Sequence, residues 1–459
     1  MATVRPDSGS PTGGPPTSVV TRNSASRLLA EFGSAFFALL ASTIVARHMG
    51  PSLKGTVSTL SYIVAIAAPA CAVGMGESAV TLLARGHADL RRALRAIVAL
   101  LVLTTSAGAA AVFGVSILIV GPGWHEFLHP LIITALTVPL ATAVGVFGLL
   151  VDSQQRIIFT SSARLTNAFV TAVLTFVLVD LLDRWTTGAM LAMAAGWGVA
   201  LIMLAGALVR SGGSHLPMWD RAYLGSAARL GIPIQISYLL IVASSRLDLL
   251  LVNLIAGASA AGLYSVSLTA AALSTYASVA LVGANYPRLA ALSTDDEWIV
   301  FTQKLTRLSV AAALVGCAGL AVVIPLLTTL IFGRAFSGSV PASLILVPGG
   351  IAWSAQWVIC RAWAARGKTG LLVKTFAPAV ATMVVLDFVF IPPLGIVGAA
   401  IAFDLSLLVG LGVSTAVYNA TARRPGAFLA LVPRLADFSQ LVVAPWHMVC
   451  QFRRQRRAH

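Results

Sequence analysis

Two charged residues interrupt an apolar run near the middle of the sequence. Arg246 and Asp248 lie in the stretch ASSRLDLLLVNLI, which otherwise is typical of a membrane-spanning helix. A charged side chain at the centre of a membrane costs about 3 kcal/mol even on the most lenient scale, so charges kept there serve pairing or function. A guanidinium also matches two phosphate oxygens at once. Arg246 is therefore a candidate for binding an anionic substrate within the membrane.

Asp248 is expected on the opposite side of the helix from Arg246. It lies two residues after Arg246, which on a helix turns it about 200° away, so the two side chains cannot pair directly. A carboxylate that pairs across helices or bonds to backbone would hold the structure together, and this structural role is favoured for Asp248. Contact with substrate is the alternative.

The first two apolar runs carry three further candidate substrate-binding residues. Arg27 and Glu31 are four residues apart and share one face of a helix. We expect Arg27 to anchor the cytoplasmic end, whereas Glu31 faces a cavity or pairs with Arg27. Glu77 follows GMG near the inner end of the second run, where a carboxylate in lipid would be costly, so it too is expected to line a cavity. Glu31, Glu77 and Asp248 are the candidates for carrying a coupling proton.

Four charged residues are predicted near the outer face. Arg47 and Lys54 flank a tight turn and could bind a diphosphate there, although anchoring at the membrane interface is the favoured interpretation. Asp387 and Asp404 are predicted near the outer ends of two late helices, where water reaches them, so a structural role is favoured for both.

The sequence argues against an enzyme and against a metal site. It has no phosphate-binding loop of the G-x-x-x-x-G-K-[ST] type and no sizeable loop for catalytic residues. Its cysteines, Cys71, Cys317, Cys360 and Cys450, are far apart and form neither a disulfide framework nor a metal pattern. No catalytic residue, metal or cofactor is predicted.

Composition places the chain in a membrane. Of its 459 residues, 58% are hydrophobic and 10% are charged, against about 25% charged in a soluble domain. Runs of about 20 apolar residues are long enough to cross a hydrocarbon core. The prediction is an all-α polytopic protein with about twelve transmembrane helices, at 27 to 46, 56 to 84, 94 to 120, 128 to 151, 158 to 181, 187 to 209, 231 to 256, 262 to 287, 309 to 332, 340 to 363, 370 to 391 and 395 to 418.

The basic residues predict orientation. With the N-terminus inside, 26 of the 31 Lys and Arg residues fall in cytoplasmic segments. We therefore expect a multi-pass plasma-membrane protein with both termini cytoplasmic. The net charge of +15 is explained by anionic inner-leaflet lipids rather than by nucleic acid. The expected order is a disordered tail (1–24), a six-helix lobe (25–209), a cytoplasmic linker (210–229), a second six-helix lobe (230–420) and a basic tail (421–459).

An internal repeat supports the two lobes. GPSLKGTVSTLSYIVAIAAPACAVGMG (50–76) aligns without gaps to GASAAGLYSVSLTAAALSTYASVALVG (257–283), an offset of 207. Because the offset carries the first helix onto the seventh, the two lobes have the same orientation in the membrane, with a central cavity between them. Close packing and turn geometry are the favoured roles of the repeated Gly and Ser residues. At this offset Arg246 corresponds to Leu39 and Asp248 to Ala41, so these charges belong to one lobe only.

Three stretches carry a family resemblance: ARHMGPSLKGTVSTLSYIVAIAAPACAVGMGESAVTLLARG, LGIPIQISYLLIVASSRLDLLLVNLIAGASAAGLYSVS and FIPPLGIVGAAIAFDLS. In order and spacing the chain resembles the polysaccharide-exporter branch of the multidrug/oligosaccharidyl-lipid/polysaccharide (MOP) flippase superfamily, over about residues 25 to 420. The resemblance implies a flippase that moves polyprenyl-diphosphate-linked oligosaccharides to the outer leaflet. It also implies a partnership with a glycan polymerase or glycosyltransferases. We expect a monomer.

Three alternatives stay open at this point. A multidrug or cation antiporter of the same superfamily should have a carboxylate-rich cavity, whereas an anionic lipid needs basic groups, so Arg246 favours the flippase. Lipid II flippases of the superfamily have fourteen helices, which the twelve predicted here do not match. A non-transporting scaffold of a glycan-synthesis complex would have no need of the charges within its spans.

Overall fold

The computed structural model describes residues 17–85, 89–211, 219–422, 432–434 and 436–438. All regular structure in these ranges is helical, and eleven helices are long and apolar enough to cross a membrane. The chain is a multi-pass membrane protein with the expected all-α fold. Helix α1 begins at Thr17, so the end of the predicted 1–24 tail is helical. Most of the predicted 421–459 tail lies outside the described residues.

Thirteen α-helices make up the described chain, joined by shorter helical turns. Their bounds are α1 Thr17–Ala72, α2 Met75–Ala84, α3 Leu90–Val120, α4 Leu128–Ser153, α5 Ile157–Thr175, α6 Trp185–Arg210, α7 Arg221–Ala243, α8 Leu247–Ala272, α9 Tyr276–Ala291, α10 Asp295–Leu327, α11 Val340–Ala365, α12 Gly370–Leu394 and α13 Ile396–Ala422. Short turns η2 (Phe176–Leu181) and η4 (Thr328–Phe332) extend α5 and α10, and η5 (Arg334–Ser339) leads into α11.

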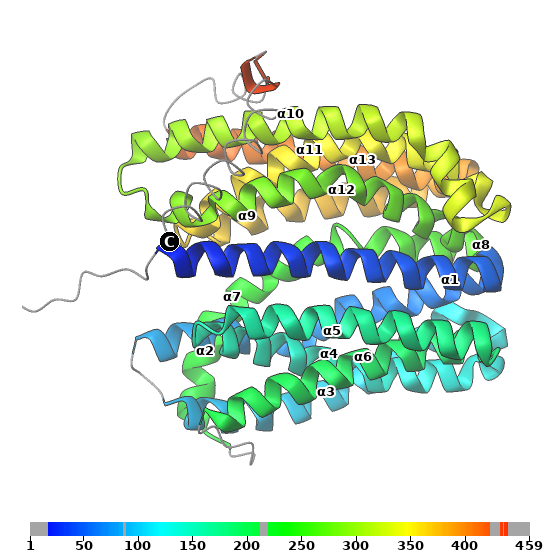
Figure 1. The fold of residues 1–459 in the computed structure, drawn as a ribbon, viewed down its shortest axis with the longest axis horizontal. Helices are drawn as coiled ribbons and strands as arrows, with labels where there is room; N and C mark the ends of the chain where they lie inside the picture. Colours follow the sequence, from blue (N-terminus) through cyan, green and yellow to red (C-terminus); the bar gives the residue numbers. More distant parts are fainter. Residues whose placement is uncertain (1–16, 86–88, 212–218, 423–431, 435, 439–459) are drawn as a thin grey trace, which may run out of the picture.

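Two glycines reverse the chain at matching positions of the repeat. Gly50 has φ 71° inside α1, and Gly257 has φ 85° inside α8. Only glycine adopts this backbone region readily, so each residue ends one membrane pass and starts the next. When both reversals are counted and α7 is joined with the part of α8 before Gly257 as one pass, the eleven candidate spans make twelve passes. Both turns lie at the right-hand end of Figure 1, called here the Gly50 end.

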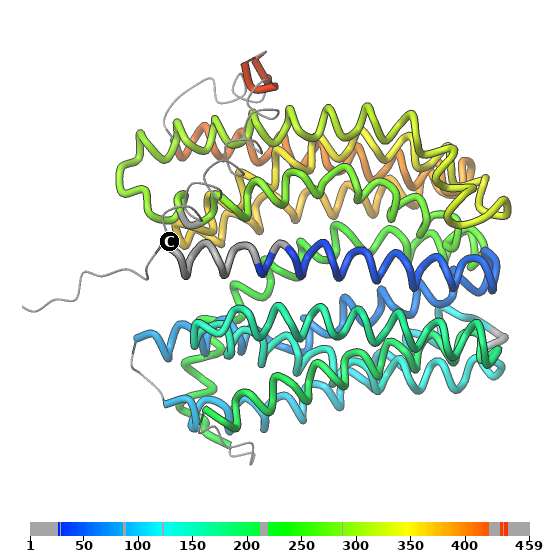
Figure 2. Tube along the Cα trace, viewed as in Figure 1, coloured from blue at the N-terminus to red at the C-terminus, as the bar shows by residue number. Residues whose placement is uncertain are grey.

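The helices form two lobes stacked one above the other in Figure 1, with the first part of α1 running between them. The lower lobe contains α2 to α6, and the upper lobe contains α8 to α13. The colours of Figure 2 show that the chain completes the lower lobe before α7 carries it to the upper one. The two expected lobes are therefore present, and α1 contacts both α5 and α8.

Helix α7 begins earlier than the sequence predicts. It starts at Arg221, inside the expected linker 210–229, because Asp220 caps it by accepting a hydrogen bond from the Tyr223 amide at 3.0 Å. Arg92 of α3 donates to Asp220 at 2.6 Å, and this bond holds the pKa of Asp220 below its ordinary value. Tyr223 and Leu224 are buried in the core of the lower lobe, so the start of α7 packs with that lobe.

Two predicted spans are broken rather than continuous. The expected helix 231–256 ends at Ala243 and restarts at Leu247. The hydroxyl groups of Ser244 and Ser245 bond back to carbonyls of the preceding turn, which competes with helix continuation. The expected helix 56–84 breaks after Ala72, where Val73 and Gly74 have positive φ.

The break at Gly74 is fixed by α7. The backbones of Gly74 and Gly231 lie so close that a Cβ on Gly74 would come within 2.1 Å of the Gly231 carbonyl oxygen. The Gly74 amide donates to Gln235 Oε1 at 3.0 Å, and Gln235 Nε2 donates to the Pro69 carbonyl at 2.7 Å. Hydropathy cannot reveal such a break, because the residues on both sides stay apolar.

Candidate functional site

Arg246 lies in the gap between α7 and α8 and reaches across to the other lobe. Its guanidinium lies 4.5 Å from the ring centre of Tyr62, a residue of the returning part of α1. Such cation–π contacts stabilise an arginine without neutralising it. Arg246 makes no ion pair within the described part of the chain. The residue predicted to lie at the middle of a helix therefore lies at a helix break, half-buried and without an ion pair among the described residues.

A second group of charges lies along the first part of α1. Glu31 Oε2 pairs with Arg164 of α5 at 2.5 Å, and Arg27 pairs with Asp152 of α4 at 2.9 Å. These side chains are partly exposed, between 27% and 61%. The expected alternative of an Arg27–Glu31 pair is wrong, because each residue has a closer partner on a neighbouring helix.

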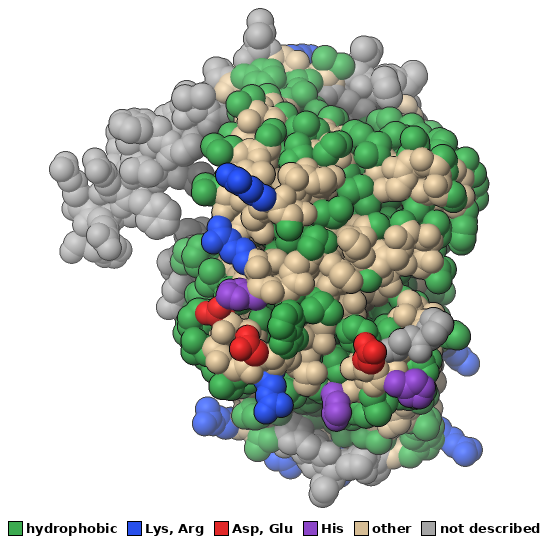
Figure 3. All heavy atoms as spheres, turned by 90° about the vertical axis from the view of Figure 1, so that its right-hand side faces the viewer, with side chains coloured by type: hydrophobic (Ala, Val, Ile, Leu, Met, Phe, Trp, Pro, Cys, Tyr) green, Lys and Arg blue, Asp and Glu red, His purple; other side chains and the backbone are tan. Residues whose placement is uncertain are grey.

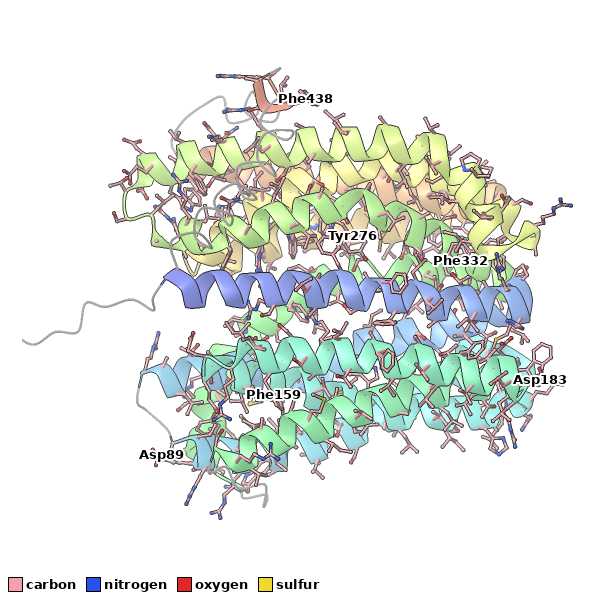
Figure 4. All side chains as sticks on the ribbon, viewed as in Figure 1. Asp89, Phe159, Asp183, Tyr276, Phe332 and Phe438 are labelled. Atoms are coloured by element: carbon pink, nitrogen blue, oxygen red, sulfur yellow. The ribbon has the colours of Figure 1, made fainter. Side chains whose placement is uncertain are left out.

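Tyr276 connects these two groups of charges. Its ring lies 6.0 Å from that of Phe32 on α1, and its hydroxyl is close enough to Glu31 and Arg246 to interact with both charges. Figure 4 shows Tyr276 between α1 and the upper lobe. Glu31 and Arg246 therefore lie in one region between the lobes, together with Tyr62 and Tyr276.

Asp248 lies inside the upper lobe. Its side chain is fully buried and accepts hydrogen bonds from the Tyr264 hydroxyl at 2.8 Å and from the Leu249 amide at 2.8 Å. This is the arrangement that the structural interpretation expected. In this conformation Asp248 cannot touch a substrate between the lobes.

Two other carboxylates accompany Asp248, and sequence reasoning misplaced one of them. Asp387 is completely buried, although its position predicted access to water. Its helix, α12, continues to Leu394 and packs against both α8 and α13. Asp404 of α13 also lies close enough to Tyr264 to interact with it electrostatically, as do Asp248 and Asp387. Asp248, Asp387 and Asp404 are called here the upper-lobe carboxylates.

The upper-lobe carboxylates are poorly satisfied. Both oxygens of Asp387 and Oδ1 of Asp404 are buried without a hydrogen-bond partner. Most buried polar atoms in proteins have a partner, so such exceptions point to a bound proton, ion or water. No group of three potential ligands in the described residues is arranged to hold a metal ion. The available signal in the sequence was the presence of three carboxylates in apolar spans of one lobe.

The remaining predicted residues do not join either group. Glu77 is half-buried in the first turn of α2 and makes no ion pair among the described residues. Arg47 lies four turns along α1 from Glu31, about 24 Å at 1.5 Å per residue. It donates to the carbonyls of Ile331, at 2.8 Å, and Leu330. The six predicted residues are therefore spread over several places in the bundle.

The lobes pack tightly at the Gly50 end. A Cβ on Gly55 would come within 1.7 Å of the Ala258 carbonyl oxygen, and one on Gly262 within 1.9 Å of the Pro51 carbonyl oxygen. The two repeated glycines thus allow two equivalent helix segments to cross in direct backbone contact. Figure 3 views this end, shows no opening between the lobes, and places most of the visible charged side chains over the lower lobe.

Comparison with solved structures identifies the fold. A multidrug resistance MATE family transporter of the MOP superfamily, in an inward-facing conformation, superposes with a TM-score of 0.67 at 13% identity, covering 85% of this chain and 96% of that one. A MATE protein in a straight conformation gives 0.65 at 15% identity, covering 89% and 97%. A MOP superfamily transporter from Pyrococcus furiosus, described as having a binding pocket of reverse polarity that suggests a different function, gives 0.67 at 14% identity, covering 89% and 96%.

Sequence comparison adds nothing to this result. No protein-family model and no curated protein matches the chain. At identities of 13% to 15% the structural likeness concerns the fold alone. This chain has the two-lobed fold of MATE transporters of the MOP superfamily.

Proposed function

We propose that the protein is a flippase that moves polyprenyl-diphosphate-linked oligosaccharides from the inner to the outer leaflet of the plasma membrane. The observation that carries the proposal is Arg246, a guanidinium held between the lobes against an aromatic ring and paired with no carboxylate of the described residues. A cation within a membrane that makes no ion pair is costly, whereas a diphosphate would neutralise it and take up its hydrogen-bond donors. The two-lobed fold supports a transporter rather than an enzyme.

Alternating access supplies the mechanism. The lobes are in backbone contact at the Gly50 end, which the basic residues predict to face outside. The substrate would enter from the cytoplasmic leaflet, with its diphosphate at Arg246 and its prenyl chain left in lipid. Rocking of one lobe against the other would then part the helices at Gly55 and Gly262 and expose the diphosphate to the outer face.

The upper-lobe carboxylates are suited to coupling. Burying ionised carboxylates that make no ion pair is unfavourable, so a proton or cation bound among them would stabilise the lobe. Asp387, whose oxygens have no partner, is the residue on which such binding would depend most. Glu31, proposed from the sequence for the same role, is already paired with Arg164.

A multidrug or cation antiporter is the second candidate, supported by the description of the inward-facing transporter of the same fold. Such a protein needs acidic groups facing its substrate. Here Asp248 and Asp387 are buried inside the upper lobe, and Arg246 is a cation between the lobes that makes no ion pair among the described residues. The Pyrococcus furiosus transporter of reverse pocket polarity provides a precedent for a MOP fold with a different substrate.

The test is translocation of a polyprenyl-diphosphate sugar in vesicles reconstituted with the full chain. We expect Arg246→Ala to reduce the rate at least about tenfold, because it removes the guanidinium that lies against Tyr62 between the lobes. Arg246→Lys should keep part of the rate, since a lysine retains the charge but not the bidentate geometry. Arg334→Ala, which removes an exposed arginine of η5, is the matched control.

Unchanged translocation by a well-folded Arg246→Ala variant would remove Arg246 from the site. Transport of a cationic compound in the same vesicles, without movement of the lipid-linked sugar, would replace the proposal by the antiporter. In a strain that lacks this protein, restoration of its function by an Arg246→Ala, Asp248→Ala double variant would support the scaffold hypothesis instead.

A further inference from the structure

Lys54 is a buried cation whose described side-chain contact is with a neutral hydroxyl group. Its residue is 7% exposed, and its Nζ donates to Ser42 Oγ at 2.9 Å. It makes no ion pair in the described part of the chain. A hydroxyl group satisfies one of the three ammonium donors and none of the charge. A buried lysine is rarely kept without a counter-charge, so Lys54 calls for an explanation.

Arg47 is partnered in the same neutral way. Its guanidinium binds carbonyls of Leu330 and Ile331, where the extension of α10 ends in the other lobe. The carbonyls of a helix end carry a partial negative charge of only about half a unit. Arg47 therefore joins the two lobes at the Gly50 end and is not neutralised by a carboxylate there.

The packing of the lobes covers Lys54, whereas Arg47 is exposed and is held by its bonds to the other lobe. Lys54 immediately precedes Gly55, whose backbone touches that of Ala258 in the other lobe. Ala46, next to Arg47, belongs to a buried cluster with Val266, Phe332 and Phe336 of the upper lobe. Separation of the lobes at this end would break the bonds of Arg47 to the helix end and remove the cover over Lys54.

We propose that Lys54, which is covered in this conformation, and Arg47, which is exposed but bonded to the other lobe, become a binding site for phosphoryl oxygens when the lobes part at the Gly50 end. The site rests on the proposed function in one respect: it would receive the diphosphate of the substrate from Arg246 before release. Its ligand is defined by chemistry alone, a phosphoryl anion presented by a diphosphate or by a lipid headgroup.

The experiment uses Gly262→Ala, called here the wedge variant, to force the lobes apart at the Gly50 end. The added Cβ would meet the Pro51 carbonyl oxygen at 1.9 Å, and parting the lobes relieves this clash without altering either cation. Gly283→Ala is the matched control, because a Cβ there meets nothing within 4 Å. Purified full chain is treated with a water-soluble amine-reactive ester, and peptide mass spectrometry measures labelling of each lysine. The other lysines, Lys304, Lys368 and Lys374, are the internal reference.

Labelling of Lys54 relative to the reference lysines should rise about tenfold in Gly262→Ala, a change worth about 1.4 kcal/mol in the opening equilibrium, and should not change in Gly283→Ala. Inorganic pyrophosphate should then slow the labelling of Lys54 in the wedge variant. Adding Arg47→Gln to the wedge variant should weaken that protection several-fold and leave labelling without pyrophosphate high.

Two results would overturn the site. Labelling of Lys54 that stays low in a folded Gly262→Ala variant would show that opening does not expose it. Labelling that rises but is indifferent to pyrophosphate, and to nanodiscs of phosphatidylglycerol compared with phosphatidylcholine, would leave Lys54 a structural residue. Protection by pyrophosphate supports a diphosphate ligand, and protection confined to phosphatidylglycerol supports a lipid headgroup. Both readouts are independent of sugar transport, so a failed flippase assay would not be mistaken for a failed site.

Discussion

Two carboxylates in each lobe are held in opposite ways. In the lower lobe, Asp152 pairs with Arg27 and Asp180 with His48, at partly exposed positions. In the upper lobe, Asp248 and Asp387 are fully buried and make no ion pair among the described residues. The repeat aligns Asp248 with Ala41, so the lobes share their turns and not their charges. The common fold therefore does not require the upper-lobe carboxylates, and their role is specific to that lobe.

Removing Asp248 should have the largest effect. We expect Asp248→Ala to lower the free energy of unfolding by about 3 kcal/mol, because the Tyr264 hydroxyl and the Leu249 amide lose their shared acceptor in a buried place. Tyr264→Phe, which removes the matching donor, should cost only about 1 kcal/mol, since Asp248 keeps the amide. Denaturant titration in detergent measures both. A cost of Asp248→Ala below that of Tyr264→Phe would contradict a structural role for this carboxylate.

The features that the two lobes share could be predicted from the sequence, whereas the burial of the charges could not. The repeat predicts the reversals at Gly50 and Gly257 because a positive φ selects glycine, and the structure confirms both. Hydropathy predicts that residues lie in the membrane. It does not predict how a helix is rotated, and rotation is what buries Asp387 completely.

The sequence also did not predict where helices break or which charged residues pair with each other. The interruption at Ser244 to Arg246 depends on hydroxyl groups that bond back to the preceding turn, and these serines are also compatible with a continuous helix. The partner of Glu31 is Arg164, which lies 133 residues away and is brought close only by packing of α1 against α5. A four-residue spacing suggests a local pair and carries no information about a neighbouring helix.

Asp387 offers a sharper test of what the buried carboxylates do. Asp387→Asn preserves the shape of the side chain and removes its charge. Since neither oxygen has a partner in this structure, we expect stability to stay within about 1 kcal/mol or to improve. Translocation driven by an ion or proton gradient should fall at least about tenfold if this carboxylate binds the coupling ion.

The control for Asp387 lies in the lower lobe. Asp180→Asn neutralises a carboxylate that is 22% exposed and paired with His48 at 2.7 Å, and it should leave gradient-driven translocation unchanged. An equal loss of gradient-driven translocation in Asp387→Asn and Asp180→Asn would contradict a coupling role specific to the upper lobe. Full activity of Asp387→Asn would assign the upper-lobe carboxylates to structure alone.

The smallest effect is expected at the exposed pair of the lower lobe. Arg164 and Glu31 are 61% and 43% exposed, so water screens their attraction and ordering two long side chains offsets part of it. Glu31→Gln and Arg164→Ala should each change the free energy of unfolding by no more than about 0.5 kcal/mol, and a double-mutant cycle should give a coupling energy in the same range. A coupling energy of about 2 kcal/mol or more would mean that this pair is shielded from water between the lobes. The carboxylates of the two lobes would then differ in whether they form ion pairs and not in how deeply they are buried.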